Sequence, residues 1–162
     1  MTDVLLAIGS NLGDRLGNLQ RAVELLRDEG VAVVTVSSVW ETAPVPADQP
    51  AFLNAALTAT TSLGPYDVLA ALKRIERALG RRPERRWGPR PVDLDILYFG
   101  DITSGAADLT IPHPRIGERA FVLAPLAEVA PPVLLPRALE QLVVVGLAGV
   151  RRTGLPLRLP GG

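Results

Sequence analysis

Residues 81–97 read RRPERRWGPRPVDLDIL and combine two contrasting halves. The first half, residues 81–90, holds five of the 17 lysines and arginines of a chain whose formal net charge is zero. The second half alternates apolar residues with Asp93 and Asp95 before it becomes fully apolar, which is the pattern of a β-strand. Alternate side chains of a strand point to the same face, so this strand presents both carboxylates together, roughly 7 Å apart at the backbone.

The two carboxylates predict a metal site. They repel each other on an apolar strand, and a divalent cation would remove that cost. Mg²⁺ prefers oxygen ligands and is commonly held by one or two carboxylates together with phosphate oxygens and water. Two such ions about 3.5–4 Å apart suit an Asp-x-Asp pair, and neighbouring arginines bind phosphate in a bidentate manner. Asp93 and Asp95 therefore indicate a magnesium–polyphosphate site, although a solvated edge strand after a basic loop has the same pattern.

The composition excludes several classes of protein. No apolar run approaches the roughly 20 residues of a membrane span, and the amino terminus lacks a signal-peptide pattern, so we expect a cytoplasmic protein that does not enter a membrane. The chain has no cysteine, which excludes disulfides, thiol nucleophiles and cysteine-bound metals. Its neutral net charge argues against general nucleic-acid binding.

Hydrophobic patterns predict alternating strands and helices. Strands are expected near residues 4–8, 31–39, 52–61 and 92–99, and helices over residues 16–26 and 68–79. Asp14 is placed to cap the first helix and Gly30 to end it. The order strand–helix–strand–strand–helix–strand is the split ferredoxin-like pattern. We therefore predict an α+β fold, a single-domain ferredoxin-like sandwich over residues 1–162 with a mainly antiparallel sheet and helices packed on its faces.

The end of the chain carries weaker signals. Residues 138–147 predict a helix against the sheet. From Arg151 onward, prolines and glycines predict a loosely packed tail.

Residues 86–96, RWGPRPVDLDI, closely resemble the signature of the hydroxymethyldihydropterin pyrophosphokinases of folate synthesis. Three further segments are similar to segments of that family: IGSNL at residues 8–12, LTIPH at 109–113 and RAFVLAPL at 119–126. The resemblance covers residues 4–136 and fades beyond them.

The resemblance implies ATP-dependent transfer of pyrophosphate to the hydroxymethyl group of 6-hydroxymethyl-7,8-dihydropterin, with release of AMP. It implies that Asp93 and Asp95 hold two Mg²⁺ ions that bridge the ATP phosphates, and that Arg81 and Arg90 add positive charge as their loop closes over ATP. Phosphoryl transfer depends mostly on positioning and charge neutralisation, so no protein general base is assigned. We expect a monomer whose partners are ATP and the pterin, with no nucleic acid and no membrane.

The resemblance also implies two sets of binding residues. A flat heterocycle with amide-like edges needs hydrogen-bonding groups at fixed positions and aromatic side chains on its faces. The residues expected at the pterin are Thr42, Ala43, Val45, Phe52, Asn54, Trp87, Asp95, Arg119 and Phe121. Those expected at ATP are Lys73, Arg74, Glu76, Arg81, Arg86, Trp87, Arg90, Ile96, Thr110, His113 and Arg119.

The chain departs from the family at a few of these positions. Pro83 stands where a second loop arginine is found, Lys73 stands where the family often has a glutamine, and Asp108 and Pro114 stand where some relatives have an arginine and an aromatic residue. The departures at Asp108 and Pro114 concern contacts to the adenosine and the phosphates.

Simpler interpretations stay open. His113 could be structural, and Phe121 could be an ordinary core aromatic residue. A ferredoxin-like RNA-binding module would need stacking aromatic residues, yet only 4% of residues are aromatic. An enzyme that releases ADP would use the same magnesium–phosphate site, and only its products would distinguish it.

Overall fold

The computed structural model describes residues 1–43, 49–80 and 91–161 and has the α+β fold that the sequence predicts. Its elements follow in the order β1 (Thr2–Ser10), α1 (Arg15–Asp28), β2 (Val31–Val36), β3 (Trp40–Thr42), β4 (Phe52–Thr61), α2 (Pro65–Ala78), β5 (Asp93–Phe99), β6 (Ser104–Ala106), β7 (Leu109–Ile111), a 3₁₀ turn η1 (Ile116–Glu118), α3 (Ala120–Val129), α4 (Leu135–Val145) and β8 (Val150–Arg152).

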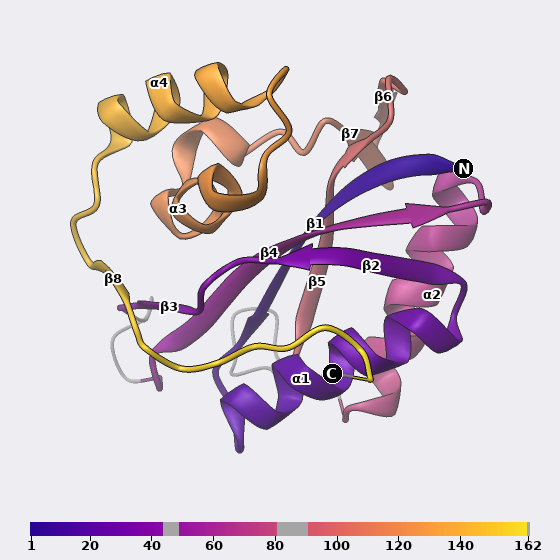
Figure 1. Ribbon diagram of the computed structural model, residues 1–162, viewed down its shortest axis with the longest axis horizontal. Helices are drawn as coiled ribbons and strands as arrows, with labels where there is room; N and C mark the ends of the chain where they lie inside the picture. The colour runs from indigo at the N-terminus through magenta and orange to yellow at the C-terminus, as the bar shows by residue number, and fades with distance from the viewer. Residues whose placement is uncertain (44–48, 81–90, 162) are drawn as a thin grey trace.

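The main sheet is antiparallel, as expected. In the described part of the chain it has six strands. Five of them follow the order β5-β1-β4-β3-β8, and β2 pairs with the carboxyl-terminal half of β4, beyond the part that pairs with β3 (Figure 1). Strands β6 and β7 form a separate hairpin. The long central strands β1 and β4 pair along their whole length, which holds the middle of the sheet in a single register.

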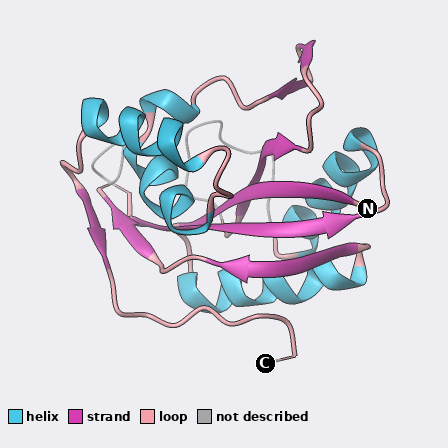
Figure 2. Cartoon of the chain, turned by 45° about the horizontal axis from the view of Figure 1, so that its top comes forward, coloured by secondary structure: helices cyan, strands magenta, loops and turns pink. Residues whose placement is uncertain are grey.

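Helices cover both faces of the sheet (Figures 1 and 2). Helices α1 and α2 cover one face, where Val4, Leu6 and Ile8 of β1 join the larger hydrophobic core. Helix α3 covers part of the other face, where Leu5 of β1 and Leu97 of β5 join a smaller core. The alternation of side chains along each strand therefore builds two cores, and the second one leaves part of its face for other residues.

Local signals place the helix ends. Asp14 caps α1, because its Oδ1 accepts a hydrogen bond of 3.0 Å from the backbone N–H of Gly17. Gly30, which has a φ of +87°, follows the helix and turns the chain into β2. Strand β2 ends at Val36, so the predicted strand over residues 31–39 is shorter than expected.

The carboxyl-terminal part differs most from the prediction. Helix α4 begins and ends a little earlier than the helix predicted over residues 138–147, and it packs on α3 and η1, while α3 is the helix that packs on β4. The reason is that residues 120–129 form the short and strongly apolar helix α3, which occupies the position on the sheet that was predicted for residues 138–147.

The tail from Arg151 is mostly exposed but attached at several points. Strand β8 adds to the sheet beside β3, and the backbone N–H and C=O of Arg158 hydrogen-bond to the side chain of Gln20 at 2.9 and 3.0 Å. Leu157 also packs against the larger core. The tail therefore crosses from the β3 edge of the sheet to α1 (Figure 1).

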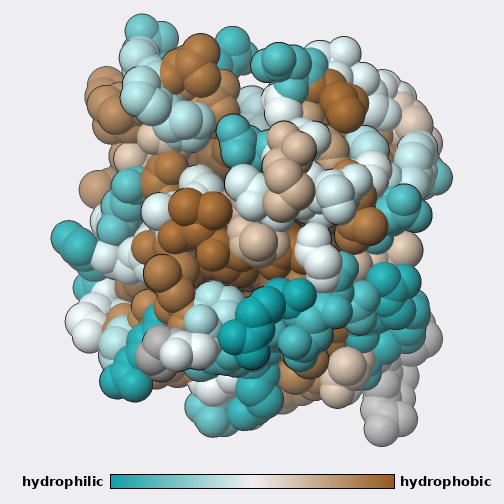
Figure 3. Space-filling model, turned by 45° about the vertical axis from the view of Figure 1, so that its right-hand side comes forward, coloured by the Kyte–Doolittle hydropathy of each residue, from teal (hydrophilic) through white to brown (hydrophobic). Residues whose placement is uncertain are grey.

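On the face that Figure 3 presents, apolar side chains gather in a central patch with hydrophilic side chains below it. Within the described ranges, none of the helices has both the length and the apolar character needed to cross a lipid bilayer.

Candidate active site

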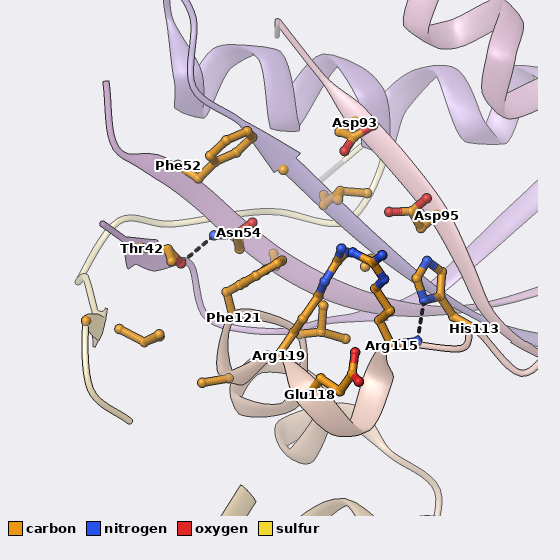
Figure 4. A pocket seen from close by; sticks show the side chains of 18 of the residues that line it. Thr42, Phe52, Asn54, Asp93, Asp95, His113, Arg115, Glu118, Arg119 and Phe121 are labelled. Atoms are coloured by element: carbon orange, nitrogen blue, oxygen red, sulfur yellow. Dashed lines mark hydrogen bonds between the residues drawn. The ribbon is translucent and has the colours of Figure 1, made fainter. Parts of the chain in front are cut away.

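A pocket of about 950 Å³ opens on the sheet face that α3 partly covers (Figure 4). Its floor comes from β1, β4 and β5, and its walls come from residues 113–122 and from β3. Residues 145–150, which connect α4 to β8, close another side. Segments from nearly the whole length of the chain therefore meet at this pocket.

Most of the described residues that the sequence predicts for the site line this pocket. They are Thr42, Ala43, Phe52, Asn54, Lys73, Asp93, Asp95, His113, Arg119 and Phe121.

Gly9 lies at the centre of the floor. In the sheet it pairs with Asn54 of β4 on one side and with Asp93 of β5 on the other, so these residues form a row across the strands. A Cβ atom at Gly9 would lie 2.9 Å from Oδ1 of Asn54 and 3.5 Å from Phe52. The missing side chain therefore leaves open the space between the amide and the carboxylate.

Asn54 is oriented by a neighbouring strand. Its Nδ2 donates a hydrogen bond of 2.7 Å to Oγ1 of Thr42, and this bond fixes which way the amide faces (Figure 4). Thr42 is itself held between β4 and β8, and the N–H of Ala43 donates to the carbonyl of Gly149 at 3.0 Å. This end of the pocket thus offers a fixed amide beside an aromatic ring, Phe52.

A second aromatic ring comes from α3. Phe121 lines the pocket, and the guanidinium of Arg119 lies 5.4 Å from the centre of its ring. At that distance the cation is attracted to the ring face, which helps to hold both side chains at the pocket wall.

The carboxylates occupy the other end of the floor. Asp93 pairs with Gly9 and Asp95 with Ala7, and both aspartates line the pocket, as the alternation of the strand predicts. Within the described residues no group of three or more His, Cys, Asp and Glu side chains could enclose a metal ion. Two carboxylates open to a pocket still fit Mg²⁺, because this ion takes its remaining ligands from phosphate and water.

His113 lies beside Asp95 at the carboxylate end of the pocket (Figure 4), where its backbone N–H donates to the carbonyl of Leu97 in β5 at 3.0 Å. Its Nδ1 accepts a hydrogen bond of 3.2 Å from the backbone N–H of Arg115, so the ring proton of the neutral form is on Nε2. Burial lowers the pKa of this imidazole, the nearby charges of Arg119 and Arg115 lower it further, and Asp93 partly opposes them. The ring is therefore neutral near neutral pH and can donate from Nε2.

Several pocket residues were not predicted from the sequence. One of them is Arg115, which extends from the turn before α3 together with the predicted Arg119 towards Asp95 and His113, so two guanidinium groups stand opposite the carboxylates (Figure 4). The position of Arg115 directly after Pro-His-Pro was an available signal. Residues 145–150 gave none, because their approach to β3 depends on the pairing of β8 at the far end of the chain.

Other predicted residues lie away from the pocket wall. Arg74 turns towards Glu29, with its Nη2 2.8 Å from Oε2 of that carboxylate. Ile96 points into the larger core on the opposite sheet face, and the hydroxyl of Thr110 donates to the carbonyl of Ala106 at 3.0 Å.

Glu76 is also absent from the pocket lining, and its side chain is buried between α2 and β5. The remaining predicted residues lie outside the described part of the chain: Val45, Arg81, Arg86, Trp87 and Arg90.

Comparison with known proteins identifies a matching family and several similar proteins. The family model described as 7,8-dihydro-6-hydroxymethylpterin-pyrophosphokinase (HPPK) matches residues 5–131. A protein of Bacillus subtilis named 2-amino-4-hydroxy-6-hydroxymethyldihydropteridine pyrophosphokinase is 51% identical over 126 residues, which cover 76% of this chain and 75% of that protein. The protein of the same name from Methylorubrum extorquens is 44% identical over 83% of this chain and 87% of its own length.

Longer proteins match as well. The mitochondrial folate synthesis bifunctional protein of pea is 51% identical over 127 residues, which cover 78% of this chain. The matched region spans 25% of that relative, about a quarter of its length. Among solved structures, Plasmodium falciparum HPPK-DHPS with pteroate has a TM-score of 0.70 at 13% identity, covering 93% of this chain and 47% of the other. This likeness concerns the fold.

Proposed function

This chain belongs to the 7,8-dihydro-6-hydroxymethylpterin-pyrophosphokinase family, and we propose that it transfers pyrophosphate from ATP to the hydroxymethyl group of 6-hydroxymethyl-7,8-dihydropterin. The substrate hydroxyl oxygen attacks the β-phosphorus of ATP, and the bond from that phosphorus to the α–β bridging oxygen breaks. AMP leaves with the bridging oxygen, the pterin keeps both outer phosphates, and the hydroxyl proton is released. The step belongs to folate biosynthesis.

The observation that carries this proposal is the row Asn54–Gly9–Asp93 across the pocket floor. An amide that recognises a heterocycle edge and a carboxylate suited to a metal–phosphate complex lie on opposite sides of a residue without a side chain. A pterin bound at Asn54, between Phe52 and Phe121, would direct its hydroxymethyl arm over Gly9 towards the carboxylates.

Asp93 and Asp95 would hold Mg²⁺ in this proposal, with two ions by analogy with two-metal phosphoryl-transfer sites. Bound magnesium supplies charge neutralisation for the triphosphate. Arg119 and Lys73 contribute positive charge from the described pocket wall, and Nε2 of His113 donates a hydrogen bond to a phosphate oxygen. Arg81 and Arg90 would add the charge of their loop, which lies outside the described residues.

Product analysis tests the proposal. The purified protein is incubated with ATP, Mg²⁺ and the reduced hydroxymethylpterin, and the nucleotides are separated by chromatography. We expect AMP in equal amount to pterin pyrophosphate, and no turnover after EDTA treatment. ADP as the product would overturn the chemistry, and an absence of nucleotide turnover would overturn the activity as a whole.

Asp95→Asn is the matched variant for the metal site. It keeps the shape of the side chain but removes a charge, so we expect a folded protein with nearly all turnover lost. Normal turnover in this variant would contradict the assignment of the metal ligands. We further propose a cytoplasmic monomer, which sedimentation of the active protein and fractionation of cells would test.

A further inference from the structure

Glu76 is a buried carboxylate for which the proposed reaction has no use. It lies on the inner side of α2, its side chain is 2% exposed, and it does not line the pocket. Burial of an ionised carboxylate is costly unless the group is paired and hydrogen-bonded. A helix position that only needed to fill the core would carry an apolar residue, as Leu72 and Ile75 do on the same face.

The contacts of Glu76 lead directly to the metal site. Its Oε2 accepts a hydrogen bond of 2.9 Å from the backbone N–H of Leu94, the residue between Asp93 and Asp95. Among the described residues β5 is the last strand of the main sheet on this side, so this amide points away from β1 and towards α2. Glu76 therefore fixes the backbone from which both aspartates project.

Its second oxygen holds a pocket cation. Oε1 of Glu76 lies 3.5 Å from Nζ of Lys73, one turn earlier on α2. Lys73 lines the pocket together with Asp93, and its side chain is half exposed, so the ammonium has room to move towards the aspartates. The attraction to Glu76 keeps this charge on the helix side of the pocket.

We propose that Glu76 is a positioning residue for the Asp93–Asp95 pair: it anchors the amide between the two aspartates and holds Lys73 away from them, so that the pair binds metal more tightly. This inference rests on the metal site of the proposed function. The carboxylate is needed for both contacts at once, because a glutamine can accept the bond from Leu94 but cannot balance the charge of Lys73.

Two variants separate these contributions. Glu76→Gln retains an acceptor for Leu94 and loses the charge, whereas Glu76→Ala loses both. Loss of groups that orient metal ligands typically weakens metal binding about 10- to 100-fold. We expect Glu76→Gln near the lower end of that range and Glu76→Ala near the upper end.

The measurement is the affinity for Mn²⁺, followed by electron paramagnetic resonance in the presence of α,β-methylene-ATP. This analogue has no cleavable α–β bridge, so binding is read without turnover and independently of whether the protein makes AMP. Thermal unfolding is recorded for each variant. Glu29→Gln is the matched control. It also removes one negative charge and breaks an ion pair with α2, because Glu29 pairs with Arg74, but neither of these two residues lines the pocket.

A double variant tests the part played by Lys73. Glu76→Gln releases the ammonium, so adding Lys73→Gln should recover part of the lost Mn²⁺ affinity. Independent effects of the two changes would refute this part of the proposal. If Glu76→Gln lowers the unfolding temperature but leaves Mn²⁺ affinity equal to that of Glu29→Gln, Glu76 is merely structural and the proposal is overturned.

Discussion

The substitution Gly9→Ala tests how the pocket floor joins its two ends. Gly9 lies in a strand with ordinary backbone angles, so an alanine there introduces one methyl group and no backbone strain. That methyl would lie 2.9 Å from Oδ1 of Asn54, whereas ordinary contact begins at 3.4 Å. The amide must therefore retreat by about 0.5 Å.

The size of the effect follows from the bond that holds this amide. Nδ2 of Asn54 lies 2.7 Å from Oγ1 of Thr42, so the retreat disturbs either this bond or the contact that the amide makes with the substrate. One hydrogen bond contributes about 0.5–1.5 kcal/mol net. Since about 1.4 kcal/mol corresponds to a factor of ten, we expect KM for the pterin to rise about two- to twelvefold.

Steady-state kinetics measure the effect by varying each substrate at saturating concentrations of the other. KM for ATP should stay close to its original value, because the clash is with Asn54 at the heterocycle end. Gly154→Ala is the control, since a methyl group there meets nothing within 4 Å. An unchanged KM for the pterin, or an equal rise for both substrates, would refute the idea that Gly9 separates the two ends.

Three further predictions concern stability. Because the pKa of His113 is lowered in the folded protein, the unfolded chain binds more protons as the pH falls below about 6.5. The stability that this group contributes is complete above that pH and is lost below it. In urea unfolding at a series of pH values, the free energy of unfolding of His113→Asn should therefore fall less on acidification than that of the unchanged protein. Thr61→Val removes the buried 2.8 Å bond from the hydroxyl to the carbonyl of Gly30, and calorimetry should show a loss of about 1–3 kcal/mol. Arg151→Ala breaks an exposed 2.6 Å contact with Glu41, and urea unfolding should show a loss below about 1 kcal/mol that disappears in high salt.

Periodic features of the sequence predicted the fold well. The alternation around Asp93 and Asp95 gave both the strand and the shared face of the carboxylates, because the period of a strand fixes which side chains lie together. Asp14 and Gly30 marked the limits of α1 through capping and backbone geometry that depend only on neighbouring residues. Such local rules needed no knowledge of the rest of the chain.

Features that depend on distant contacts could not be predicted in this way. The resemblance placed Glu76 at ATP, and only the position of β5 shows that its carboxylate accepts a hydrogen bond from the backbone of Leu94. Residues 145–150 line the pocket only because β8 pairs with β3, more than a hundred residues earlier in the sequence. No periodicity encodes either contact.

The position of the pocket follows from three neighbouring strands that change character at the same level of the sheet. On the face towards α3, β1 carries Leu5, then Ala7, then Gly9, and the side chains shrink along the strand. Beside it, β4 passes from buried Ala56 to Asn54, and β5 passes from buried Leu97 to the two aspartates.

The larger apolar residues of this set pack against α3, so the packed layer ends where small and polar residues begin. An open floor with hydrogen-bonding groups is the result, and it lies beside the start of α3, which adds Phe121 as a wall. The same alternation sends Val4, Leu6 and Ile8 into the core beneath α1 and α2. The pocket can therefore carry polar residues on one face of the strands while the opposite face keeps the sheet anchored to its main core.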